Sequence, residues 1–555
     1  MSRGSAPDRI LTDLLLWTGA GGPPGAAASG QALAFRKGRI LALGPAGDVE
    51  ALARSDTEVV RLGGRFVAPG FVDAHVHLLA GGLALSRLDL RGCGSVEEVL
   101  ARIRERAGEL PPDAWVLGGD WSEEDWGGPE PTRDLLDRAA PNRPVFLHRT
   151  DLHTAVANSR ALELAGVGPD TPEPENGVVE RDPETGEPTG VLREHALLLV
   201  TRVLPESSEA ERRAAVRSAL GRALAGGITQ VHDMGGIQDV DESWTSLEIL
   251  RRLRDDGELP LRVYAALPLA HWSRVAAMVR DHGRGDGLLG WGMVKGFVDG
   301  SLGSSTAWFQ KPYADDPENM GTPISDLDEL RNCLASALEH GLQPAVHAIG
   351  DRAVDWLFRA REEVGAGAEE VGDLPFRVEH AQHLPPDGVS RSARTGMILS
   401  VQPYHLTDDA PRVSEKLGPE REGRALAFRS MLDAGATLAF GSDWPVAPLE
   451  PVRTLQAGVT RVPAADRGSE GDRRGEAWTP GERLSIEEAL VAHTRGGDRA
   501  GLPGARAGIL EAGREADLVV LSRNPFQTDP LEWHRELKVE MTFVAGKPVY
   551  RSEGG

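Results

Sequence analysis

The stretch FVAPGFVDAHVHLLAGG, residues 66–82, leads from strand-forming residues through a Pro-Gly pair to Asp73, His75 and His77. Side chains alternate between the two faces of a strand, so His75 and His77 lie on the same face. Two adjacent imidazoles are a poor hydrophobic core, but they form half of a metal site. A solvated strand face with two polar residues would give the same pattern, so the rest of the chain decides between the two interpretations.

The composition is that of a globular protein with a strong negative charge. Of 555 residues, 40% are hydrophobic and 26% are charged, which is enough for two or three domains. The net charge of −23 argues against nucleic acid and anionic membranes as partners, because both require a basic face. We expect neither a transmembrane helix nor a signal peptide. The two cysteines, Cys93 and Cys333, form no disulfide framework, which favours a cytoplasmic protein.

Both ends of the chain have the pattern of short strands separated by turns. Near the N-terminus these are ILTDLLLWTG, ALAFRKGRILALG and TEVVRLGGRFVAPG, and near the C-terminus GREADLVVLSRNP and VEMTFVAGKPVY. Alternation with Gly punctuation is typical of a small β-domain. We therefore predict one small β-sandwich domain formed by both termini, residues 1–68 and 501–555.

The middle of the chain, residues 69–500, alternates strand-like and helix-like segments. The strand-like segments after the first are WVLGGD, PVFLHRTD, ITQVHD, LRVYAALP, GMVKGFVDG, QPAVHAIG, FRVEHAQ, MILSVQP and TLAFGSDWP. Repeated β-then-α units indicate a parallel sheet, and a count near eight predicts an α/β fold with a (β/α)₈ TIM-type barrel. The Pro- and Gly-rich segment at about 110–195 is expected to be an elaborated insertion on this barrel.

Metal-competent residues recur in or at the ends of these strands. The carboxyl ends of barrel strands meet at one mouth, so scattered residues would form one cluster there. A single histidine at a strand end is more often structural, and Asp443 could cap a helix. Coincidence is the weaker explanation for six residues at equivalent positions, which are His75, His77, Lys295, His347, His380 and Asp443.

Lys295 is one of only six lysines and lies in an apolar strand. A buried lysine is costly and loses its proton readily. The neutral amine reacts with carbon dioxide to give a carbamate, an anion able to bridge two cations. Alternatively, Lys295 forms a buried salt bridge with Asp299, and the sequence does not separate these two possibilities.

These motifs together resemble the amidohydrolase superfamily, and more narrowly its amidohydrolase-3 group, related to YtcJ and to N-substituted formamide deformylase. The resemblance spans nearly the whole chain. At the superfamily level it rests on the HxH motif that follows PGFVDAH. The narrower group is indicated by KGFVDGSLGS and RVEHAQ, and the resemblance also includes APGFVDAHVHL, DLHTAVANSRAL, AVHAIGDRAVD, SVQPYH and AFGSDWPV.

The resemblance implies a role for each of the six residues. His75 and His77 would bind the more buried metal, and His347 and His380 the second metal. Lys295 would be the carboxylated lysine that bridges them. Asp443 would bind the first metal and act as the general base. Zinc is the expected ion, one or two per chain, although iron, manganese or nickel could occupy the same ligands.

The implied function is a metal-dependent amidohydrolase that cleaves a C–N amide-type, non-peptide bond of a small substrate by a metal-activated hydroxide. An esterase, lactonase or carbamate hydrolase would use the same site. A non-catalytic binding scaffold is the alternative from another class. A homodimer is possible. Candidate substrate-binding residues are Trp121, Asp151, His153, Gln402, His405 and Trp444.

Overall fold

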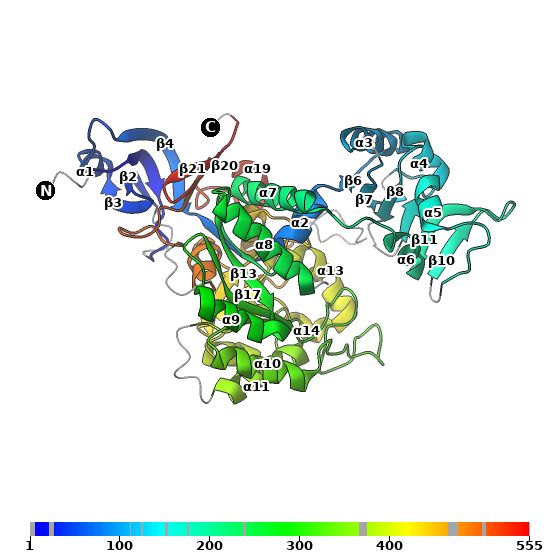
Figure 1. The fold of residues 1–555 in the computed structure, drawn as a ribbon. Coiled ribbons are helices and arrows are strands. Elements are labelled where there is room, and N and C mark those ends of the chain that lie inside the picture. The colour runs from blue at the N-terminus through cyan, green and yellow to red at the C-terminus, as the bar shows by residue number, and fades with distance from the viewer. Residues whose placement is uncertain are drawn as a thin grey trace. The chain divides into compact units, whose positions relative to one another are not determined.

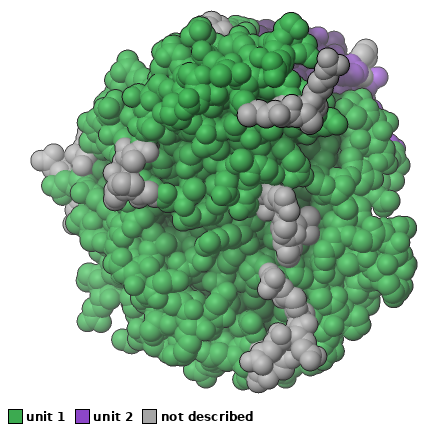
Figure 2. All heavy atoms as spheres, turned by 90° about the vertical axis from the view of Figure 1, so that its left-hand side faces the viewer, with its two compact units in different colours: residues 1–80, 216–555 green, residues 81–215 purple. Residues whose placement is uncertain are grey.

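The protein is described here by a computed structural model in which two compact units are present, Met1–Ala80 with Val216–Gly555, and Gly81–Ala215 (Figure 2). The segment at about 110–195, expected to be an elaborated insertion, falls inside the second unit. The described residues are 6–21, 27–111, 113–123, 126–149, 154–174, 177–236, 240–365, 374–463, 476–501 and 507–553.

The first unit contains a sheet of eight parallel strands. Neighbouring strands follow one another in chain order, as expected when each strand is connected to the next by a helical crossover. The strands are β5 (Phe71–Val76), β12 (Ile228–Asp233), β13 (Arg262–Pro268), β14 (Leu289–Phe297), β15 (Gln343–Ala348), β16 (Arg377–His380), β17 (Ile398–Val401) and β18 (Thr437–Phe440).

The sheet closes into a barrel through the segment after β18. The backbone N–H of Asp443 donates to the carbonyl of His75 at 2.7 Å, and the N–H of His77 donates to the carbonyl of Trp444 at 2.9 Å. Val76 and Trp444 form the parallel bridge between these two bonds. The closure therefore fixes Asp443 beside both histidines of the first strand.

Helices lie on the outside of the barrel, and α8 to α11 are labelled around β13 in Figure 1. Every residue of β5 and β12 is buried, as expected for strands covered on both faces. The larger helices are α7 (Glu209–Ala225), α8 (Val240–Asp255), α9 (Trp272–His282), α10 (Leu327–Glu339), α11 (Asp351–Gly365), α12 (Gly388–Arg394), α13 (Leu406–Leu417), α15 (Phe428–Asp433), α16 (Pro451–Thr460) and α17 (Ile486–Val491).

Both ends of the chain contribute to one seven-stranded mixed sheet, in which blue β2 and β4 lie near red β20 and β21 (Figure 1). The rings of Phe35 on β2 and Phe543 on β20 lie 6.3 Å apart although three strands separate β2 from β20, so the sheet folds over a shared core. In sheet order the strands are β21 (Lys547–Arg551), β20 (Val539–Val544), β19 (Leu518–Leu521), β4 (Glu58–Pro69), β1 (Arg9–Leu16), β2 (Ala28–Arg36) and β3 (Arg39–Pro45).

The second unit is built on a six-stranded mixed sheet with an apolar core on each face. Leu147 and Val156 belong to one core, while their chain neighbours Phe146, Ala155 and Ala157 belong to the other, which is the two-residue period of a strand. The elements are β6 (Leu88–Asp89), β7 (Val116–Trp121), β8 (Val145–Arg149), β9 (Thr154–Ala157), β10 (Gly177–Arg181), β11 (Pro188–Glu194), α3 (Val96–Glu109), α4 (Arg133–Ala139) and α5 (Ser159–Ala165).

The predicted α/β fold with an eight-stranded TIM-type barrel is confirmed, and both termini form one seven-stranded mixed sheet where a small β-sandwich was predicted. Two of the expected strand segments, WVLGGD and PVFLHRTD, contribute β7 and β8 to the second unit rather than to the barrel. The strands β6, β7 and β8 pair in parallel, as barrel strands do, which explains why these two segments show the same alternation of strand-like and helix-like sequence as the barrel. Within the described ranges, no helix combines the length and the apolar character needed to cross a membrane.

Candidate metal centre

A cavity of about 430 Å³ lies at the carboxyl ends of the barrel strands. Its walls come from β5, β14, β15, β16 and the segments that follow β17 and β18. Convergence at this end of the barrel is what the fold imposes on strand-end residues. The structure thus brings together all six expected metal-competent residues, which are His75, His77, Lys295, His347, His380 and Asp443.

His75, on β5, and His77, directly after that strand, each have one ring nitrogen in a hydrogen bond and the other directed at a carboxylate. Nδ1 of His75 lies 2.7 Å from Oε2 of Glu379, and Nδ1 of His77 lies 2.8 Å from the carbonyl of Gly235. Both partners accept hydrogen bonds, so each Nδ1 carries the proton. The Nε2 atoms lie 3.4 and 3.3 Å from Oδ1 of Asp443 and retain the lone pairs that a metal would use.

The histidines of β15 and β16 are held in the same way. Nδ1 of His380 lies 2.9 Å from Oε1 of Gln402, and Nε2 of His347 lies 3.1 Å from the carbonyl of Gly300. Each ring therefore donates through one nitrogen and keeps a lone pair on the other. The rings of His347 and His380 lie 4.5 Å apart, and those of His75 and His380 lie 4.9 Å apart, so these three imidazoles adjoin one another in the cavity.

Two of the candidate ligands have strained backbones. The φ angle is +72° at His380 and +60° at Asp443, in the left-handed region that non-glycine residues rarely adopt. Such conformations cost about 1–3 kcal/mol each and persist where the surrounding structure holds them. Here the strained turn places His380 and Asp443 beside His75, with one ligand atom of each residue within 4.8 Å of the others.

Burial keeps His75, His347 and His380 neutral near pH 7. It lowers the pKa of His75 to about 4 and that of His347 to about 3, and it lowers the pKa of His380 well below its usual value. Burial acts to raise the pKa of Asp443, but the adjacent imidazoles, led by His75, hold it well below its usual range. Neutral imidazoles with one carboxylate are the donor set that zinc prefers.

Lys295 does not form the salt bridge with Asp299 that the sequence left open. Its Nζ is buried, has no hydrogen-bond partner among the residues the structure describes, and lies 5.0 Å from the ring centre of Phe297. Burial lowers the pKa of Lys295 to about 8, which enlarges the neutral fraction of the amine. The carboxylate of Asp299 instead accepts three backbone N–H groups, at 2.7 to 3.0 Å, from Trp308, Gly350 and Ile349.

A fully buried ion pair behind the site was missed from the sequence. Arg377 donates to both carboxylate oxygens of Glu379, at 2.8 and 3.1 Å, and Glu379 accepts from His75. Arg377 also donates to the carbonyl of Ala74 at 2.6 Å and to Nδ1 of His232 at 2.8 Å, so His232 belongs to this network and not to the cavity walls. The motif RVEH could have indicated this pair, because it places two opposite charges two residues apart on a buried strand.

Replacing Arg377 with Met is expected to lower the free energy of unfolding by about 3–5 kcal/mol, because Glu379 would remain buried without its counter-charge. The control is Arg359→Met, which removes an exposed arginine from Asp355 while Arg391 still pairs with that carboxylate, and should change the stability by at most about 1 kcal/mol. Urea unfolding followed by circular dichroism compares the two variants. Equal losses would contradict the role assigned to the buried pair.

The structure places the candidate substrate-binding residues in different surroundings. His405 lines the cavity, with Nε2 3.6 Å from Oδ2 of Asp443. Gln402 is buried behind His380, and the Trp444 carbonyl belongs to the barrel closure. Trp121 is buried in the core of the second unit, where its indole N–H donates to the carbonyl of Leu147 at 3.0 Å. Asp151 and His153 lie outside the described residues.

Comparison with known proteins explains this arrangement. The model of the amidohydrolase family matches residues 58–550, which is most of the chain. The chain belongs to the amidohydrolase family. The resemblance to the amidohydrolase-3 group that its motifs indicated is therefore confirmed. Several of those motifs contribute residues to the cavity described above, among them His75, His380 and Asp443.

Three curated relatives cover nearly all of this amidohydrolase. The protein LONG AFTER FAR-RED 3 of Arabidopsis thaliana is 37% identical over 99% of this chain and 92% of its own length. The putative amidohydrolase YtcJ of Bacillus subtilis is 32% identical over 90% of this chain and 92% of its own. The N-substituted formamide deformylase of Arthrobacter pascens is 31% identical over 94% and 95%, respectively.

A solved structure agrees with the architecture. The crystal structure of an uncharacterized metal-dependent hydrolase from Pyrococcus furiosus matches this amidohydrolase with a TM-score of 0.74 and 30% identity. The match covers 94% of this chain and 100% of that one. The combination of barrel and terminal sheet is thus shared with an experimentally determined relative.

Proposed function

We propose that this amidohydrolase is a metal-dependent hydrolase that cleaves a C–N amide-type, non-peptide bond of a small substrate. The observation that carries the proposal is the cavity in which four imidazoles, one carboxylate and one buried lysine amine converge, the amine having no hydrogen-bond partner among the described residues. Two relatives support the proposal, since one is a metal-dependent hydrolase and the other an N-substituted formamide deformylase.

The donor set fits a zinc-class ion, with iron, manganese or nickel as alternatives. His75 and His77 would hold one ion through Nε2, together with Asp443. His347 and His380 would hold a second. When bound, such an ion lowers the pKa of a coordinated water towards ~7 and polarises a carbonyl.

The chain's own residues supply the proton transfers. Asp443 is ionised, and its Oδ1 lies 3.3 Å from Nε2 of His77, so Asp443 would take the proton of the attacking water as general base. It then gives that proton to the leaving nitrogen. His405 faces the other carboxylate oxygen and limits the orientations that Asp443 adopts.

Lys295 is proposed to be carboxylated. The neutral amine would add to carbon dioxide with loss of one proton, giving an N-carboxylate. The unpaired, buried Nζ and the lowered pKa of Lys295 support this modification. An anion at this position, between the two pairs of histidines, would allow two ions per chain, whereas a bare amine would leave one.

The test is a screen of matched amides and esters with the purified, metal-replete protein. N-butylformamide, butyl formate and a simple lactone share the activated carbonyl and differ in the leaving group. The proposal predicts the highest kcat/KM on the amide. Turnover of esters or lactones alone would favour the esterase alternative, and no turnover of any compound would favour a binding scaffold.

The acidic surface suits a small-molecule substrate better than nucleic acid. Cys93 and Cys333 form no disulfide bond, which fits the proposed cytoplasmic location. A homodimer stays a prediction, tested by the molecular mass in solution.

A further inference from the structure

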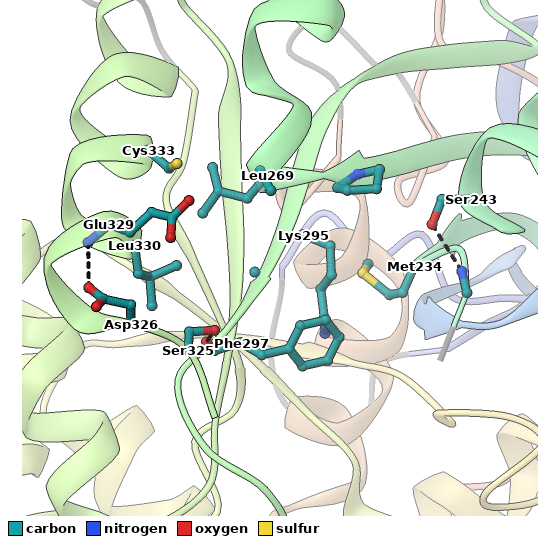
Figure 3. Close-up of a pocket in the computed structure, with 14 residues that line it drawn as sticks. Met234, Ser243, Leu269, Lys295, Phe297, Ser325, Asp326, Glu329, Leu330 and Cys333 are labelled. Carbon is teal, nitrogen blue, oxygen red and sulfur yellow. Dashed lines mark hydrogen bonds between the residues drawn. The ribbon is translucent and has the colours of Figure 1, made fainter. Parts of the chain in front are cut away.

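A second cavity, of about 310 Å³, lies beside the metal centre at the ends of β12, β13 and β14 and against α10. Lys295 and Phe297 line both this cavity and the metal-centre cavity. Figure 3 shows these two side chains with Leu269 and Leu330 on one side and Met234 on the other. A molecule in the second cavity would therefore contact the same side chains as a carbonyl compound at the metal centre.

Gly296 allows the strand to lie close to two leucines of the cavity wall. A Cβ at Gly296 would lie 2.8 Å from Cδ2 of Leu269 and 3.3 Å from Cδ1 of Leu330, so any larger residue would displace these two side chains. Gly296 directly follows Lys295 in the chain. Gly296 lines the second cavity, and Lys295 lines both cavities.

Most polar groups of the cavity wall are already paired within the protein. The Asp326 carboxylate caps α10 by accepting the N–H groups of Asp328 and Glu329 at 3.0 and 2.9 Å. The Ser325 hydroxyl donates to the carbonyl of Phe297 at 2.7 Å, and the Ser243 hydroxyl accepts from a backbone N–H (Figure 3). An occupant is thus offered mainly apolar contacts.

We propose that this second cavity binds an uncharged apolar group, of about six to ten carbon atoms, of the substrate whose carbonyl lies at the metal centre. A dry cavity of roughly 150 Å³ is enough for benzene, so about twice that volume accepts a ring with a short chain. The exposed carboxylate of Glu329 disfavours an anionic end on this group. The inference rests on the proposed function and adds the substrate class to it.

Two substrate series test the proposal and distinguish the two ends of the substrate. One series lengthens the nitrogen substituent, from N-methylformamide through N-butyl- to N-(cyclohexylmethyl)formamide. The other lengthens the acyl chain on N-methylamides. In one of the two series, kcat/KM should rise roughly fourfold per added methylene, and the series that responds identifies the end that enters the cavity.

Filling the cavity should abolish this rise. Cys333 lines the cavity from α10 and is half-buried, so Cys333→Phe places a ring inside it. We expect at least a tenfold loss of kcat/KM for the cyclohexylmethyl compound or its acyl counterpart, with the methyl compound unchanged. The control is Asn332→Phe, which adds the same ring at an exposed position of α10. Equal losses in both variants, or no selective loss in either, would overturn the proposal.

Thiol labelling tests the cavity without any turnover. Cys333 is the half-buried thiol and Cys93 is fully buried, so a disulfide reagent should modify Cys333 first. Saturating n-hexanol should slow this modification at least threefold in the wild-type protein, whereas methanol should not. If hexanol protects Cys333 from the reagent but no amide is turned over, the second cavity is an apolar binding site and the proposed reaction is wrong. Absence of protection would overturn the cavity as an apolar site.

Discussion

Replacing Asp443 with Asn should lower kcat roughly 10³-fold while the protein keeps at least one metal ion per chain. The amide has nearly the same shape as the carboxylate, and its oxygen would still lie near the Nε2 atoms of His75 and His77. It cannot accept a proton from water at neutral pH. The loss should therefore be in turnover rather than in folding or in metal binding by the histidines.

The experiment compares kcat and metal content in the same preparations. The matched control is Asp433→Asn, on α15, where an exposed carboxylate pairs with Arg429 and takes no part in the site. That variant should retain wild-type turnover. Full turnover in Asp443→Asn would remove this residue from the role of general base, whatever the metal content.

Replacing His75 with Ala should weaken metal binding by at least about 100-fold and remove activity with it. Loss of a residue that only orients a ligand already costs 10- to 100-fold in affinity, and His75 is proposed as a ligand itself. The Ala side chain would also leave Oε2 of Glu379 without the imidazole N–H that it accepts. Retained Arg377 contacts should keep the barrel folded.

Equilibrium dialysis against zinc followed by elemental analysis measures this change. His282→Ala, on the exposed end of α9, is the control and should bind metal as the wild type does. His347→Ala tests the second pair of histidines in the same assay. Unchanged zinc affinity in both His75→Ala and His347→Ala would show that the cluster is not the metal site.

Much of the site could be predicted because strand geometry is periodic and the barrel has one mouth. His75 and His77 share a face by their spacing, and the strand ends at His347, His380 and Asp443 converge once eight parallel strands are assumed. The apolar surroundings of Lys295 in the sequence were also a sufficient signal of its burial, which the structure shows.

The remaining features depend on contacts between distant parts of the chain. The pairing of His75 with Glu379 joins residues 304 positions apart, and the left-handed turn at His380 arises from the packing around it. The Asp299 carboxylate accepts three backbone N–H groups instead of pairing with Lys295, an arrangement that the sequence did not indicate. The parallel strands of the second unit gave the same local pattern as the barrel, so only their pairing separates the two sheets.

Metal content per chain, measured by elemental analysis of protein purified without added metal, tests the central claim most directly. We expect one or two zinc-class ions per chain, and two would support the bridge through a carboxylated Lys295. One ion would keep the hydrolase proposal and favour a bare amine at Lys295. No ion, with none taken up after zinc is added, would contradict the assignment of His75, His77, His347, His380 and Asp443 as a metal centre.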